Sequence, residues 1–124
     1  MPVSDDVLDP DEDVYQLPDV AKLLGVPVTR VHQMLRDHEL LAVRRGGVIA
    51  VPEVLFTTDP RSGAGRLVRW VPGLVSVLHD GGFTPEEALR WLFTADESLP
   101  GRPVDALHGQ LAREVIRRAQ ALAL

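Results

Sequence analysis

The sequence predicts a mainly α-helical protein with one small β-hairpin. Two short amphipathic segments are separated by a glycine-containing turn, and a hairpin signal follows directly after the second segment. Further helix signals come after a linker rich in Gly, Pro, Ser and Thr. This order is the outline of a winged helix-turn-helix with a helical C-terminal extension. The predicted divisions are a tail (1–14), the winged helix-turn-helix (15–56), a linker (57–66) and a helical subdomain (67–124).

The first helix is expected to begin at Asp19, whose carboxylate suits an N-cap, and to end before Gly25, a natural C′ residue. The apolar residues between them have helical spacing. A second helix is predicted over residues 28–38, because Pro27 fits at or just before a first helical turn. Its inward face holds Val28, Val31 and Leu35, and its outward face holds Thr29, Arg30, His32, Gln33 and Arg36.

The hairpin is predicted over residues 40–51, where two short apolar runs meet at Gly46-Gly47. Two successive glycines supply the positive φ angles that a tight hairpin turn requires. In the C-terminal part, one helix is expected within residues 67–79, and the segment 84–87 (TPEE) begins another with a capping box and proline in the first turn. The last helix is expected to end near Ala123.

Charge is distributed unevenly along the chain. The protein has a formal net charge of −5, yet residues 1–16 alone carry six acids and no Lys or Arg, while residues 17–69 carry eight basic and five acidic side chains. Because low hydrophobicity, prolines and a run of like charge are typical of disorder, the tail is predicted to be disordered. The basic middle of the chain coincides with the predicted helix-turn-helix and hairpin.

Several functional classes are not expected. The sequence has no cysteine, and its four histidines lack the spacing of a metal site. Its Gly-rich pieces lack the residues of a phosphate-binding loop. We therefore expect no enzyme activity, no metal and no cofactor. Since the chain has neither a secretion signal nor a long apolar stretch, a cytoplasmic location is expected, with no membrane contact.

The predicted fold points to duplex DNA as the partner, because a helix-turn-helix places its second helix in the major groove. Arginine can pair bidentately with guanine and glutamine with adenine, and basic residues at a hairpin tip can reach the backbone or the minor groove. Basic side chains cluster on both of these elements. The candidate DNA-binding residues are Thr29, Arg30, Gln33, Arg36, Arg44 and Arg45.

The segment from Leu17 to Pro52 resembles the N-terminal winged helix of excisionase and MerR-type proteins. Together with the C-terminal part it closely resembles the actinobacterial family of small winged-helix DNA-binding proteins that includes a mycobacterial serine/threonine kinase substrate. The resemblance covers roughly residues 14–124 and depends on the motifs LLGVPVTRVHQML, GGFTPEEALRWLF and LPGRPVDAL. It implies DNA binding by the same six residues, a mobile N-terminal tail, and a kinase as a candidate partner. One departure is Pro27, where many such helices have a capping Ser or Thr.

Two alternatives stay open at this point. The C-terminal segment from Trp91 to Leu107 also resembles, distantly, the helical domain of toxin-neutralising antitoxins, which would make the protein an adaptor acting through its C-terminal helices. The acidic tail could compete with DNA for the arginines, with Ser4 as a candidate phosphorylation site, or could serve only solubility. Two half-sites are usually needed for specific readout, so a homodimer on DNA is a further expectation.

Overall fold

The computed structural model describes residues 3–124 and contains a small mixed sheet, a second hairpin and six α-helices. The elements in chain order are β1 (Val3–Asp5), β2 (Val14–Gln16), α1 (Leu17–Leu24), α2 (Val28–Arg36), β3 (Ala42–Arg45), β4 (Val48–Pro52), the 3₁₀ turn η1 (Glu53–Leu55), β5 (Phe56–Thr58), β6 (Gly65–Leu67), α3 (Val71–Asp80), α4 (Pro85–Phe93), α5 (Pro103–Ala106) and α6 (Ala112–Leu122). The predicted fold class, a winged helix-turn-helix with a helical extension, is confirmed.

Helices α1 and α2 form the helix-turn-helix, with boundaries slightly different from those predicted. The first helix begins at Leu17, so Asp19 lies in its first turn and Gln16 is the N-cap; Gly25 ends it in the left-handed conformation, with φ 68°. The second helix follows Pro27, which offers no side-chain cap, and ends at Arg36. Beyond that end, His38 has φ 58°, which stops the helix before its predicted end.

The predicted wing is present as the antiparallel pair β3 and β4. Its tip is Gly46-Gly47, with φ 58° and 79°, the double positive pattern of a tight hairpin turn. The wing forms the centre of a four-stranded sheet with the order β1-β3-β4-β2. The two edge strands come from the N-terminal region.

The structure corrects the prediction of a disordered tail. β1 pairs in parallel with β3, and β2 pairs antiparallel with β4, so the N-terminal region completes the sheet on both edges. Between these strands Leu8 is buried in the core, at 8% exposure. Backbone pairing and burial of one leucine thus hold a segment whose composition predicted disorder. Of the predicted tail, residues 1 and 2 lie outside the described part.

The predicted linker is also corrected. Strands β5 and β6 pair antiparallel, with Phe56 opposite Leu67, and form a second hairpin. Its loop is closed by the carboxylate of Asp59, which accepts hydrogen bonds from the backbone N–H groups of Arg61 (2.7 Å) and Ser62 (3.4 Å). The turn chemistry of Asp, Ser and Gly thus makes a hairpin tip where the sequence suggested an unstructured connection.

The C-terminal helices share one hydrophobic core with the winged helix. Fully buried side chains come from α1, α2 and β3 on one side and from α3, α4 and α6 on the other, including Val20, Val31, Val43, Leu74, Leu89 and Val115. The predicted capping box is confirmed: Thr84 accepts from the Glu87 N–H, and Glu87 accepts from the Thr84 N–H. In addition, the ring of His38 stacks on that of His79 in α3, with centroids 3.5 Å apart.

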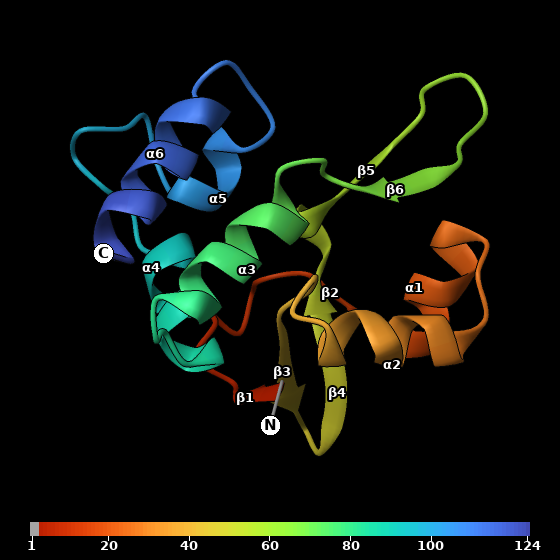
Figure 1. Ribbon diagram of the computed structural model, residues 1–124. Coiled ribbons are helices and arrows are strands. Elements are labelled where there is room, and N and C mark those ends of the chain that lie inside the picture. Colours follow the sequence, from red (N-terminus) through yellow and green to blue (C-terminus); the bar gives the residue numbers. More distant parts are fainter. Residues whose placement is uncertain (1–2) are drawn as a thin grey trace.

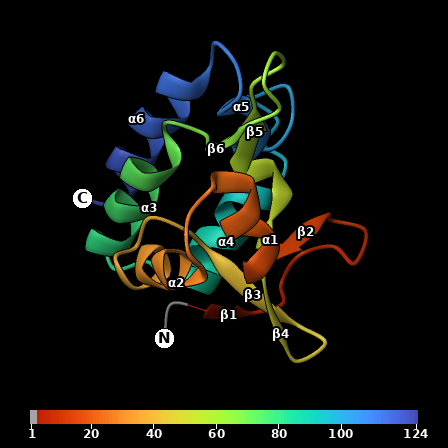
Figure 2. The ribbon, with the colours of Figure 1, turned by 90° about the vertical axis from the view of Figure 1, so that its right-hand side faces the viewer.

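The helix-turn-helix lies between the two hairpins. In Figure 1 the β3–β4 wing extends to the bottom and the β5–β6 hairpin to the top right, with α1 and α2 between them. Figure 2 shows the same order from the side, with β6 above α1 and the wing below it. The C-terminal helices α4 and α6 lie on the other side of the molecule (Figure 1). The surface around α1 and α2 is therefore flanked by a hairpin on each side.

Candidate nucleic-acid interface

The outward face of α2 carries the polar residues that the sequence singled out. The opposite face is anchored, because Val31, Met34 and Leu35 are buried in the core. Helical periodicity then turns the intervening residues towards solvent. Thr29, Gln33 and Arg36 are exposed, and Arg30 is half-exposed. All four α2 candidates therefore lie on one exposed face of the helix. Their guanidinium, amide and hydroxyl groups are of the kinds that bind base edges and phosphates.

One of these residues already has a partner. The guanidinium Nη1 of Arg30 lies 3.5 Å from Oε2 of Glu39, and both side chains remain partly exposed, at 41% and 29%. Exposed ion pairs of this kind are weak, so Arg30 can exchange Glu39 for another anion at little cost. Glu39 also places a negative charge beside the candidate surface.

The two wing arginines have different environments, because consecutive side chains of a strand point to opposite faces of the sheet. Arg44 is exposed and shares its face with Ile49, its partner across the wing. Asp5 is its neighbour in the sheet register, and within residues 3–124 no ion pair to Arg44 is found. Arg44 therefore offers a cation at the wing surface.

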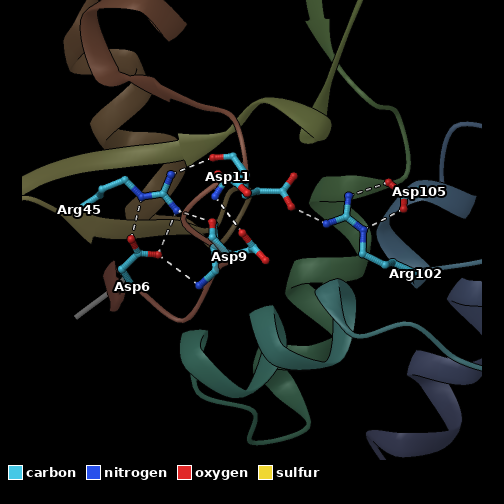
Figure 3. A network of polar contacts seen from close by, with 8 residues as sticks. Asp6, Asp9, Asp11, Arg45, Arg102 and Asp105 are labelled. Carbon is cyan, nitrogen blue, oxygen red and sulfur yellow. Dashed lines mark hydrogen bonds and ion pairs between the residues drawn. The ribbon is translucent and has the colours of Figure 1, made fainter.

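Arg45, in contrast, binds the protein's own N-terminal segment (Figure 3). Its Nε donates to Oδ2 of Asp6 at 2.7 Å and its Nη2 to Oδ1 of the same carboxylate at 3.3 Å. The same guanidinium donates to the backbone carbonyls of Glu12 (2.8 Å) and Asp9 (3.1 Å). These hydrogen bonds from Arg45 hold residues 6–12 against the wing. Of the site residues predicted from the sequence, Arg45 is therefore the one that binds the protein itself and does not face the candidate surface.

A second arginine continues this network into the C-terminal part (Figure 3). Arg102 forms an ion pair with Glu12 and a bidentate pair with Asp105, at 2.8 and 2.9 Å. These hydrogen bonds from Arg102 hold the pKa of the Asp105 carboxyl below its usual value. In the same way, the hydrogen bond from Arg45 lowers the pKa of Asp6. Two acidic side chains of the N-terminal segment, Asp6 and Glu12, are thus paired with arginines in the folded protein.

The tail's candidate phosphorylation site is not accessible in this arrangement. Ser4 lies in β1 opposite Val43, its side chain is 6% exposed, and its hydroxyl donates to the Asp5 carbonyl at 2.7 Å. A kinase could reach this hydroxyl only after β1 had separated from β3. The structure therefore does not support Ser4 as a modification site of the folded protein.

Sequence reasoning missed one group of surface cations near the helix-turn-helix. Arg61 and Arg66 are exposed on the second hairpin, which was taken for a linker. A signal was present, since an Asp-Pro-x-Ser-Gly turn between two β-branched or apolar runs is also a hairpin pattern.

Within residues 3–124 we find no cluster of three metal-ligating side chains and no helix long and apolar enough to cross a membrane.

Comparisons with known proteins agree with this architecture. Residues 1–56 match the family "DNA-binding protein Rv2175c, wHTH domain", and residues 68–123 match the family "Rv2175c C-terminal domain of unknown function". The DNA-binding protein Rv2175c of Mycobacterium tuberculosis (strain H37Rv) is 52% identical over 135 residues, which span 99% of this chain and 89% of that protein. The NMR structure of Rv2175c superimposes with a TM-score of 0.86, covering all of this chain and 90% of that one.

Replacing Arg45 tests its role in the fold. We expect Arg45→Ala to lower the free energy of unfolding by about 2 kcal/mol, because it leaves a partly buried carboxylate and two carbonyls without their donor. The neighbouring Arg44→Ala removes the same charge from an exposed position and should change stability by less than about 0.5 kcal/mol. Urea unfolding followed by circular dichroism measures both. Equal effects of the two substitutions would contradict the assignment.

The lowered pKa of Asp6 predicts a pH dependence. A carboxyl whose pKa is lower in the folded state stabilises the protein above its unfolded pKa, near 4, and this contribution disappears as the pH falls through the folded value. We therefore expect Asp6→Asn to be less stable than the wild type at pH 7 and nearly as stable at pH 3. Denaturant unfolding at both pH values provides the comparison, and a difference that stays constant with pH would rule out this linkage.

Proposed function

This chain belongs to the family of the DNA-binding protein Rv2175c, and on that basis we propose that it binds duplex DNA through its winged helix-turn-helix. In this proposal α2 enters the major groove, and Arg44 on the wing reaches the adjacent backbone or minor groove. The observation that carries it is the exposed polar face of α2, bearing Thr29, Arg30, Gln33 and Arg36, beside a wing whose outward cation is free of ion pairs within residues 3–124.

Each residue has a distinct chemical task in this proposal. Arg36 and Arg30 can donate two parallel hydrogen bonds to guanine, and Gln33 can pair with adenine. Thr29, at the first turn of α2, suits a phosphate or a thymine methyl group. Arg45 is left out of the DNA-contacting set, because its donors are used by residues 6–12.

The biological role we propose is that of a cytoplasmic transcriptional or architectural regulator, without catalytic activity or cofactor. A single recognition helix reads few base pairs, so binding as a homodimer to two half-sites supports specificity. Part of the negative charge is neutralised within the protein, since two of the six N-terminal acids, Asp6 and Glu12, are paired with Arg45 and Arg102.

The proposal predicts salt-sensitive DNA binding that depends on Arg36 and Arg44. We expect the Arg36→Ala/Arg44→Ala variant to bind a fluorescent random-sequence duplex of about 25 base pairs at least roughly tenfold more weakly at low salt, because base and phosphate contacts of arginine contribute about 1–3 kcal/mol each. Fluorescence anisotropy at two salt concentrations measures this. The matched control is Arg90→Ala/Arg117→Ala, which removes two exposed cations from α4 and α6. If both variants bind like the wild type, α2 and the wing are not the interface.

For the Arg30–Glu39 pair we predict a substitution that tightens DNA binding instead of weakening it. Glu39→Gln removes a negative charge next to the α2 surface and releases Arg30, so DNA binding should become tighter by about two- to fivefold at low salt, consistent with a charge interaction of up to about 1 kcal/mol. The gain should shrink as salt is raised. The same anisotropy titration measures it, with Glu86→Gln on α4 as the control, and weaker binding by Glu39→Gln would argue against Arg30 as a DNA contact.

A further inference from the structure

We propose that the β5–β6 hairpin is a second DNA-contacting element, which binds backbone phosphates through Arg61 and Arg66 on the flank of the helix-turn-helix opposite the wing. This inference rests on the proposed function, since it needs duplex DNA to occupy α2. The hairpin lies between the two regions that match known families, at residues 1–56 and 68–123, so most of it falls outside both.

The hairpin is held against the helix-turn-helix by direct packing. Gly65 in β6 lies so close to Leu23 of α1 that a Cβ atom at Gly65 would stand 2.2 Å from Leu23 Cγ. Such a distance is far inside van der Waals contact, so only glycine permits this approach. At its base, the Val68 N–H donates to the Leu55 carbonyl at 2.9 Å. The position of the hairpin is therefore set by α1 rather than left to a flexible connection.

The loop is internally ordered, which keeps its cations in place. The Asp59 N–H donates to the Ala64 carbonyl, and the Gly63 N–H donates to the Asp59 carbonyl, both at 2.8 Å. Gly63 has φ 72°, a conformation that the turn requires and that glycine adopts without strain. An ordered loop loses little conformational entropy when it binds.

The cations of the hairpin are available for an external anion. Arg61 and Arg66 are exposed and line the same surface hollow, together with Thr57. Because Gly65 faces α1, the adjacent Arg66 lies on the outer face of the hairpin, where it also borders a hollow lined by Arg69 and Trp70. Neither Arg61 nor Arg66 forms an ion pair within residues 3–124, whereas Arg45, Arg90, Arg102, Arg117 and Arg118 all do. The nearest acid in the sequence, Asp59, uses one carboxylate oxygen for the backbone N–H groups of the turn.

The wing and the β5–β6 hairpin lie on opposite sides of α1 and α2 (Figures 1 and 2). A helix in the major groove of DNA lies between two phosphate strands. The wing can follow one strand while the β5–β6 hairpin follows the other. Since phosphate contacts carry no direct sequence information, the second hairpin should add affinity and salt dependence without adding base preference.

The test compares salt dependence among charge-matched variants of the full chain. The slope of log Kd plotted against log salt concentration reports the number of phosphate contacts, at about one unit for each contact. We therefore expect Arg61→Gln/Arg66→Gln to reduce the magnitude of this slope by about two. Arg90→Gln/Arg117→Gln makes the same change in net charge on α4 and α6 and should keep the wild-type slope. Arg61→Lys/Arg66→Lys should retain the slope, because a phosphate contact needs the charge rather than the guanidinium fork.

A second variant keeps both arginines and moves the hairpin. Gly65→Val cannot keep the contact with Leu23, so it should weaken DNA binding with both cations still present. Thermal unfolding of each variant verifies that the protein remains folded. Wild-type binding with an unchanged slope in Arg61→Gln/Arg66→Gln would overturn this inference and leave the proposed function standing. Absence of wild-type binding at low salt would overturn the proposed function, and with it the role of the hairpin.

Discussion

One continuous hydrophobic core determines how this protein presents its charged surface. The core runs from Val20 and Val31 in the helix-turn-helix to Leu74 and Val115 in the C-terminal helices, so the two parts are not separately stable units. Burial of each such side chain contributes about 1.5–3 kcal/mol. Polar links at the periphery, among them the stacked His38 and His79 rings, join the same two parts. The C-terminal helix α3 therefore packs against the segment that follows α2.

The location of the charged side chains matters more for DNA binding than the net charge of the chain. The acidic N-terminal region would repel DNA if it were a free tail, but it forms both edges of the sheet and directs Asp6 and Glu12 to Arg45 and Arg102 (Figure 3). The cations of α2, the wing and the second hairpin have few or weak internal partners by comparison. In this protein of net charge −5, Arg36, Arg44, Arg61 and Arg66 are thus exposed while Asp6 and Glu12 are paired with arginines.

The elements that local sequence specifies were predictable, and those that depend on distant partners were not. Helical periodicity, Gly25 and the pair Gly46-Gly47 identified the helix-turn-helix and its wing. Strands of three residues show no measurable alternation, so β1, β2 and the second hairpin could be found only from their pairing. The two wing arginines are adjacent in sequence but face opposite sides of the sheet. The partner of Arg45 comes from the segment between β1 and β2, which composition had predicted to be disordered.

In the proposed complex, duplex DNA covers α2 and both hairpins. Backbone amide NMR shifts, mapped on addition of a short duplex at low salt, test this arrangement. We expect shifts in α2, around Arg44 in the wing and in residues 59–66, with little change in α5 and α6. Shifts concentrated in α5 and α6, near the exposed Leu111 and Leu122, or no shifts at all, would rule out this arrangement and favour a protein partner for the C-terminal helices.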